Sequence, residues 1–119
     1  LLHGKMPILG WRFDAVDASG AALNDVPGPF PFAWCTDCSA IPPESWPRLE
    51  GLRHLFLDML RPRSHPTHFC LDESLAVAEK VGAKQTWFIH MSHDVSHVAL
   101  EASLPSGIAP AHDGLVVSG

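Results

Sequence analysis

The sequence contains no tyrosine, no long apolar run and no excess of basic residues. Its longest apolar stretches, such as residues 55–57 and 87–89, are far below the roughly 18 residues that a membrane-spanning helix needs. No charged and then apolar segment opens the chain, which argues against a secretory signal. With 8 Lys and Arg against 13 Asp and Glu, the formal net charge is −5, so no basic patch of the kind that grips nucleic acid is visible. We therefore expect a soluble, cytoplasmic protein whose partners are neither membranes nor nucleic acids.

Cysteine is also scarce, with Cys35, Cys38 and Cys70 as the three examples. An odd count argues against a disulfide framework and indicates a reducing compartment. Cys35 and Cys38 form a C-x-x-C pair, but a single pair without a second one is a weak signal for zinc binding or redox chemistry. We interpret both residues as small side chains packed around the end of a strand.

Proline, glycine and histidine are the residues present in quantity. Eleven Pro and nine Gly in 119 residues predict many loops and turns, and the length suits a single domain. There are eight histidines, and five of them fall in two clusters, at residues 65–68 and 90–97. Because the imidazole pKa lies near neutrality, the charge of this chain should be unusually sensitive to pH between about 5 and 7.

The apolar pattern predicts an α/β fold in which helices cover a sheet. Strands are expected over residues 6–13, 32–36, 55–60, 85–89 and 115–117. Helices are expected over 71–81, after Cys70 and before Gly82, and from a cap at Asp94 to about Ser103, with one or two helical turns at 42–46. Residues 14–31 are rich in Gly, Pro, Asn and Asp, which predicts a surface loop or hairpin.

Three candidate metal ligands, His3, Asp37 and His90, fall where predicted strands give way to loops, and His68 and His93 lie on neighbouring loops. Such placement lets residues far apart in the sequence converge at one edge of a sheet. Imidazole and carboxylate groups together suit zinc, manganese or iron. Taken singly, each histidine also fits a surface or capping role, but their clustering favours a site.

Five ordered segments carry a family resemblance: TDCSAIP at 36–42, LDMLR at 57–61, HPTHF at 65–69, HMSHD at 90–94 and HDGL at 112–115. Together they resemble the C-terminal half of metallo-β-lactamase-fold hydrolases, and most of all the phosphoribosyl 1,2-cyclic phosphate phosphodiesterases. The resemblance implies that residues 1–119 are the C-terminal part of a single metallo-hydrolase domain with an αββα sandwich. In that reading, residues 14–31 are an inserted loop or hairpin.

The resemblance also implies a chemistry, namely hydrolysis of a small cyclic phosphodiester at a centre of two divalent ions, zinc or manganese. Matched motif by motif, His3 corresponds to one metal ligand, Asp37 to the bridging carboxylate and His90 to the final ligand. This fits the physical chemistry, because a carboxylate has two oxygens and paired cations both activate water and neutralise a phosphate. An acidic protein could bind an anionic substrate in this way.

Three further histidines receive roles from the same resemblance. His68 corresponds to the histidine that protonates the leaving group, a task that suits a side chain with a pKa near neutrality. His65 and His93 are expected to bind the substrate phosphate or to support the ligands. A small phosphorylated molecule is therefore the expected substrate.

One motif of the family, His-x-His-x-Asp-His, does not occur in the 119 residues. We therefore expect this stretch to be inactive alone, to lack an N-terminal half and to expose an apolar sheet face. Two alternatives remain: a non-catalytic or split fragment that needs a partner chain or forms a homodimer, and a ribonuclease Z-like RNA processing enzyme. The negative charge counts against the second alternative. The plainest alternative is an α/β domain whose histidines are incidental.

Overall fold

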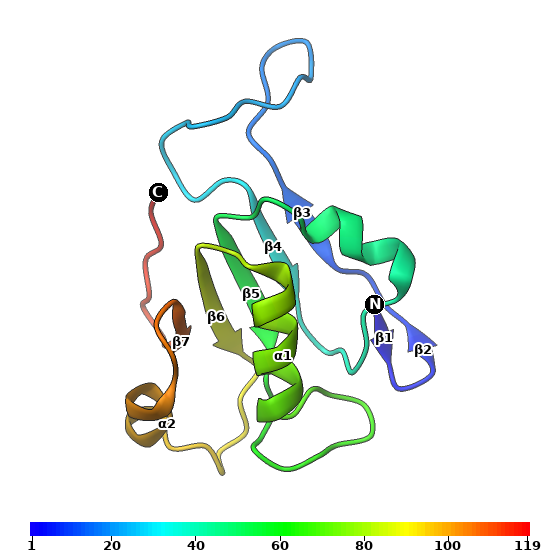
Figure 1. Cartoon of the computed structure of the whole chain (residues 1–119), viewed down its shortest axis with the longest axis vertical. Helices are drawn as coiled ribbons and strands as arrows, with labels where there is room; N and C mark the ends of the chain where they lie inside the picture. The colour runs from blue at the N-terminus through cyan, green and yellow to red at the C-terminus, as the bar shows by residue number, and fades with distance from the viewer.

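The computed structural model describes residues 1–119 as a five-stranded sheet, three helices and a small hairpin (Figure 1). The hairpin pairs β1 (Leu2–His3) with β2 (Met6–Pro7). The sheet runs in the order β3 (Trp11–Phe13), β4 (Phe32–Cys35), β5 (His54–Asp58), β6 (Gln85–Ile89) and β7 (Ile108–Pro110). Strand β3 is antiparallel to β4, and the other neighbours are parallel. The predicted α/β class is confirmed.

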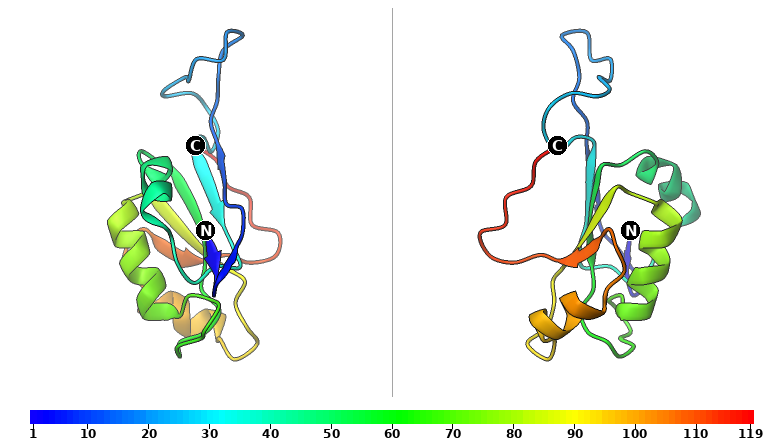
Figure 2. Two further views of the ribbon diagram at one scale, coloured as in Figure 1. Left: turned by 90° about the vertical axis from the view of Figure 1, so that its right-hand side faces the viewer. Right: turned by 60° about the vertical axis from the view of Figure 1, so that its left-hand side comes forward.

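Three helices connect the parallel strands: η1, a 3₁₀ helix (Pro43–Leu49), α1 (Leu71–Val81) and α2 (His97–Ser103). Parallel neighbours require crossover connections, and crossovers of one hand place their helices on the same face of a sheet. Figure 2 shows η1 and α1 on one side of the sheet and the C-terminal tail on the other. The core therefore lies between the sheet and its helices, where Leu55, Leu57 and Phe88 are completely buried.

Helix α1 spans the predicted residues, and both of its ends follow from the sequence. Cys70 and Glu73 form a capping box at its start, in which the Glu73 carboxylate accepts the Cys70 backbone N–H at 3.0 Å. Gly82 ends the helix in the left-handed region, at φ 65°, where a residue with a Cβ would be strained. Ser74 and Val77 on its inner face are buried against the sheet.

Two predictions for the last third of the chain are wrong. Helix α2 is capped by Ser96 and not by Asp94, because the Ser96 hydroxyl accepts the Ala99 N–H at 3.3 Å. The last strand is β7 and not residues 115–117, because the turn that ends at Gly107 leaves 108–110 alongside β6. Residues 115–117 instead cross the opposite face of the sheet, where they line a cavity with two aromatic residues, Trp34 and Phe56.

The predicted strand over residues 6–13 is divided between the hairpin and the sheet. Its first part pairs with β1 through a turn at Gly4, and only Trp11–Phe13 joins the large sheet. Residues 14–31 form the predicted loop, which contains one bridge between Val16 and Ala22 and projects beyond the sheet in Figure 1.

The sheet face opposite α1 is aromatic and stays open where the C-terminal tail does not cross it. Trp11, Phe13 and Trp34 are 56%, 43% and 39% exposed. The rings of Phe13 and Phe32 stack at 4.6 Å between centroids, and those of Trp34 and Phe56 at 4.9 Å. The expected exposure of an apolar sheet face is confirmed. None of the helices has the length and apolar character needed to cross a bilayer.

Candidate metal centre

Three acidic or imidazole side chains stand at the carboxyl ends of the central strands. Asp37 follows β4, Asp58 ends β5, and His90 follows β6. Because β4, β5 and β6 are parallel, these ends share one edge of the sheet. Asp37 and His90 both adopt the left-handed region, at φ 53° and 61°, which Asp and His enter more readily than most residues. Their side chains meet at the edge, with 3.1 Å between Asp37 Oδ1 and His90 Nε2.

The β1–β2 hairpin adds His3 to the same edge. Its backbone is fixed to the loop after β4, since Leu2 N–H donates to the Ala40 carbonyl at 3.1 Å and Ser39 N–H donates to the Leu2 carbonyl at 2.7 Å. Gly4 N–H also donates to the Ser39 hydroxyl at 3.0 Å. His3 Nε2 consequently lies 3.2 Å from His68 Nε2, although the two residues are far apart in the sequence.

Asp58 is the centre of the hydrogen bonding at this edge. Its side chain is completely buried, and Oδ2 accepts the Cys38 backbone N–H at 2.9 Å and lies 2.8 Å from His68 Nδ1. Its other oxygen, Oδ1, has no hydrogen-bond partner and lies 3.8 Å from His90 Nδ1. Burial raises the pKa of Asp58, and the hydrogen bonds from His68 and Cys38 oppose that rise.

Sequence reasoning did not select Asp58 as a site residue. The available signal was a single acid within the apolar run of residues 55–60. Because an Asp is almost never fully buried unless it is paired, such a residue indicates that a polar side chain elsewhere in the fold is hydrogen-bonded to it. That partner is His68. The family resemblance assigned His68 the role of proton donor but predicted no hydrogen-bond partner for it.

His68 lies in the middle of a group of imidazole rings. Its ring centroid is 4.7 Å from that of His3, 5.1 Å from that of His65 and 5.0 Å from that of His90, with which it stacks at 22°. Desolvation, then the charges of Arg61 and His68, lower the pKa of His65. His65 Nδ1 accepts the backbone N–H of its neighbour, Thr67, at 3.2 Å.

His93 lies outside this group. Its side chain is 96% exposed, and its only charged contact is with Asp94, 3.4 Å away. Three histidines of the sequence analysis, His3, His68 and His90, are therefore brought together with Asp37 and Asp58, while His65 packs beside His68 and His93 has no contact with the group. We call the convergent residues the histidine–aspartate cluster, which consists of His3, Asp37, Asp58, His68 and His90.

The donor atoms of the cluster form two overlapping groups of three. His3, Asp37 and His68 make one group, and Asp58, His68 and His90 make the other, with the ligand atoms of each group within 4.8 Å of one another. Imidazole nitrogens and carboxylate oxygens are the donors that zinc, manganese and iron share. Two ring nitrogens that face each other and an unpartnered buried carboxylate oxygen are both suited to a cation. The residues present therefore fit a divalent metal ion.

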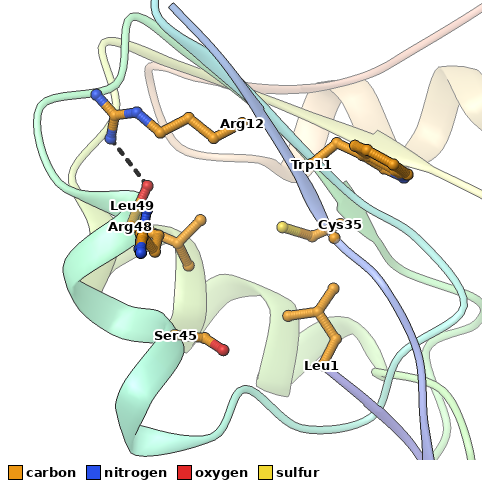
Figure 3. Close-up of a pocket in the computed structure, with 8 residues that line it drawn as sticks. Leu1, Trp11, Arg12, Cys35, Ser45, Arg48 and Leu49 are labelled. Atoms are coloured by element: carbon orange, nitrogen blue, oxygen red, sulfur yellow. Dashed lines mark hydrogen bonds between the residues drawn. The ribbon is translucent and has the colours of Figure 1, made fainter.

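A separate cavity of about 110 Å³ lies between η1 and the β3–β4 pair (Figure 3). Leu1, Trp11 and Leu49 are among its lining residues, and the Arg12 guanidinium donates to the Arg48 carbonyl at 2.8 Å beside it. The Cys35 thiol faces this cavity (Figure 3), and burial raises its pKa to about 11. None of the cluster residues lines the cavity. It thus contributes no chemistry to the candidate centre.

All three cysteines are buried free thiols. The Cys38 thiol is 3.7 Å from the Cys35 carbonyl oxygen, and burial raises the pKa of Cys38. A buried, protonated thiol is a poor metal ligand and a poor nucleophile. The structure therefore agrees with the interpretation of the C-x-x-C pair as packed side chains.

The sheet gathers histidines and aspartates at the carboxyl edge of its strands, an arrangement that fits a hydrolase domain of the metallo-β-lactamase fold. Residues 3–91 match the family model described as a beta-lactamase superfamily domain, and the chain belongs to that superfamily. The predicted family resemblance and fold are thus confirmed.

Six chains of solved structures match this one. One of them is described as the crystal structure of a new diphosphatase from the PhnP family, and it is 43% identical with a TM-score of 0.81. The match covers 97% of this chain and 39% of the relative, so the chain spans well under half of that protein's length. No curated protein matches the chain.

Proposed function

We propose that this chain supplies the C-terminal part of a metal-dependent hydrolase that cleaves a phosphorus–oxygen bond in a small phosphorylated substrate. The observation that carries the proposal is the convergence of the histidine–aspartate cluster at one sheet edge in a chain of the beta-lactamase superfamily. The 43% identity to a protein described as a diphosphatase supports phosphorus as the reacting centre.

His3, Asp37 and His90 are proposed to hold two divalent ions, zinc or manganese, with Asp37 as the bridging carboxylate. Asp37 suits this position because its two oxygens lie at the edge between the histidines, one of them 3.1 Å from His90 Nε2. When bound, such ions would offset the negative charge of a phosphate and lower the pKa of water. This explains how a chain with a net charge of −5 could accept an anionic substrate.

His68 is proposed to donate a proton to the oxygen that leaves phosphorus. Its Nδ1 is occupied by Asp58, so only Nε2 is available to a substrate. Nε2 points to the side where His3 lies, which is the side of the proposed ions. His65, whose ring packs edge-on against His68, and the exposed His93 are proposed to contact the phosphate group.

A small cyclic phosphodiester is the first candidate substrate, on the resemblance of the five ordered segments. A diphosphate bond is the second, because the solved relative is described as a diphosphatase. The two differ in the leaving group. An alkoxide is a strong base and requires a proton as it departs, whereas a phosphate is a much weaker base and requires one far less.

The test is hydrolysis by the full-length protein, loaded with zinc or manganese, of a ribose cyclic phosphodiester and of a nucleotide sugar that contains a diphosphate bond. We expect turnover of the cyclic diester to fall about 10²- to 10⁴-fold in His68→Ala. His97→Ala serves as the control, because His97 is a half-exposed histidine that pairs with Glu101 outside the cluster. No hydrolysis of either substrate with either metal would refute the proposed function.

The metal content of His68→Ala separates two roles for this residue. The His68 ring nitrogen belongs to both groups of candidate ligand atoms, so it could bind an ion directly. If His68 is the proton donor, the variant should retain zinc at wild-type stoichiometry while turnover falls. A loss of zinc in step with turnover would assign His68 to the metal ligands.

The partners and compartment of the protein are also part of the proposal. More than half of the solved relative lies outside the matched region, and the open aromatic face of this chain requires a cover. We propose that a second protein layer covers this face, either from the same polypeptide or from a partner chain. Three free buried cysteines support the cytoplasm as the compartment.

A further inference from the structure

We propose that Asp58 is a positioning residue that fixes the tautomer and the orientation of His68, so that His68 presents Nε2 to the substrate. This inference rests on the proposed function for its chemical consequence, but the geometry that carries it is independent of any substrate. Asp58 itself is completely buried and does not face the open side of the cluster.

The hydrogen bond to Asp58 indicates which ring nitrogen of His68 carries a proton. An ionised carboxylate accepts hydrogen bonds and donates none, so with Asp58 ionised the 2.8 Å contact between Asp58 Oδ2 and His68 Nδ1 places a proton on Nδ1. In the neutral ring, Nε2 then has a free lone pair, and it is directed toward His3. A charged ring carries its second proton on Nε2, where a leaving oxygen can take it.

Asp58 is itself held rigidly from three sides. Oδ2 also accepts the Cys38 N–H at 2.9 Å, which ties it to the turn containing Asp37. The Asp58 carbonyl accepts the hydroxyl of the buried Ser74 of helix α1 at 2.6 Å. The next residue, Met59, donates its N–H to the Ile89 carbonyl at 3.1 Å. Asp58 therefore sets the position of His68 relative to the ends of three neighbouring strands.

The consequence for the reaction can be written with its protons accounted for. Water forms a new bond from its oxygen to phosphorus and releases one proton to the solvent, while the bond between phosphorus and the leaving oxygen breaks. The leaving oxygen takes the Nε2 proton of His68, and His68 becomes neutral until solvent protonates it again. Asp58 stays a carboxylate throughout and stabilises the charged ring beside it.

Asp58→Asn tests this role in the full-length protein, with Ser74→Ala as the matched control. Asn preserves the size of the side chain but removes the charge that stabilises a charged His68 ring. One oxygen, Asp58 Oδ2, accepts from both Cys38 N–H and His68 Nδ1. An amide oxygen in its place keeps both hydrogen bonds without the charge, whereas an amide NH₂ in its place donates to Nδ1 and loses the bond from Cys38 N–H. Ser74→Ala removes a different buried hydrogen bond to the same residue and leaves the carboxylate in place.

The readout is the dependence on the leaving group. With a ribose cyclic phosphodiester, Asp58→Asn should lower kcat by about 10²- to 10⁴-fold with little change in KM. With bis(4-nitrophenyl) phosphate, whose leaving group needs no proton, kcat should fall less than about 10-fold. Ser74→Ala should affect both substrates equally. An equal loss on both substrates in Asp58→Asn, or a loss of bound zinc, would overturn the assignment.

A second measurement remains decisive if neither substrate is hydrolysed. Two-bond ¹H–¹⁵N correlation spectra of the chelator-treated, full-length protein report which ring nitrogen of His68 carries a proton, and His68→Ala identifies the signal. A proton on Nδ1 in the wild type is the expected result. In Asp58→Asn the proton stays on Nδ1 if the amide oxygen takes the place of Oδ2, and it moves to Nε2 if the amide NH₂ does. A wild-type ring without a proton on Nδ1 would overturn the proposal, whatever the activity of the protein.

Discussion

Asp37→Asn is the most informative single substitution in the candidate metal centre, because it removes the charge and almost nothing else. Asp37 occupies the left-handed region at φ 53°, and Asn enters this region as readily as Asp. The backbone turn after β4 should therefore persist. Asp37→Ala is the matched comparison, since Ala also removes the carboxylate but is strained at that backbone conformation.

The magnitudes follow from the local structure. The Asp37 side chain is 49% exposed and lies 3.1 Å from His90, so this exposed contact stabilises the metal-free fold by about 0–1 kcal/mol. Asn should therefore change the free energy of unfolding by less than about 1 kcal/mol. Ala should cost about 1–2 kcal/mol more, because of the left-handed backbone. Loss of a residue that merely supports a ligand lowers metal affinity about 10- to 100-fold, so loss of a bridging ligand should lower it at least about 100-fold.

Two assays on the full-length protein separate these effects. Competition with a chromophoric chelator measures zinc affinity, and urea unfolding of the chelator-treated protein measures the stability of the fold. The expected result is that both variants lose zinc affinity alike and only Ala loses stability. Unchanged zinc affinity in Asp37→Asn would refute the assignment of this carboxylate as a metal ligand. Equal instability of the two variants would refute the argument from the backbone turn.

Three further outcomes are expected. Leu57→Ala should lower the free energy of unfolding, measured in urea, by about 2–5 kcal/mol, because Leu57 is completely buried at the centre of the sheet. A loss below about 1 kcal/mol would contradict the tight packing of β5. Iodoacetamide at pH 8 should label Cys35 only after unfolding, since burial raises its pKa to about 11, and labelling of the native protein at the rate of the unfolded protein would disprove this. The isolated 119-residue chain should bind a fluorescent apolar dye through its open face, and Trp34→Ser should reduce the signal, whereas an unaltered signal would place the dye elsewhere.

The elements that could be predicted from the sequence are those whose limits are set by local chemistry. Helix α1 is an example, because an apolar stripe, an acidic first turn and Gly82 all act within a few residues of one another. Strands β5 and β6 were predictable as apolar runs bounded by polar or turn residues. Residues 14–31 were predictable as a loop for the same reason.

The errors arose where tertiary contacts decided the outcome. Residues 115–117 have a strong β propensity, yet the edge of the sheet is already occupied by 108–110. The tail lies across the open face instead, and the Ser118 carbonyl is 3.0 Å from His54 Nε2. Asp94 and Ser96 are both good capping residues, and only the position of the chain after the Ser92–Val95 turn decides between them.

In the candidate site, too, some features follow from the local sequence and others depend on tertiary contacts. The positions of Asp37 and His90 at strand ends could be predicted, because parallel strands bring their carboxyl ends together. The pairing of Asp58 with His68 could not, because it depends on how the loop of residues 60–69 returns to the end of β5. The Phe69 N–H donates to the Cys38 carbonyl at 2.8 Å, the Phe69 carbonyl accepts the Leu60 N–H at 3.0 Å, and these contacts place His68 beside the buried carboxylate.

The exposure of the cluster shows from which side a substrate must arrive. The side chains of Asp58 and His68 are 0% and 11% exposed, whereas those of Asp37 and His90 are 49% and 40% exposed. The side of the cluster toward α1 is therefore closed, and water, phosphate and any further metal ligand must all approach past Asp37 and His90. His68, the proposed proton donor, is hydrogen-bonded through Nδ1 to Asp58 on the closed side. A substrate can therefore reach its other ring nitrogen, Nε2, only from the open side.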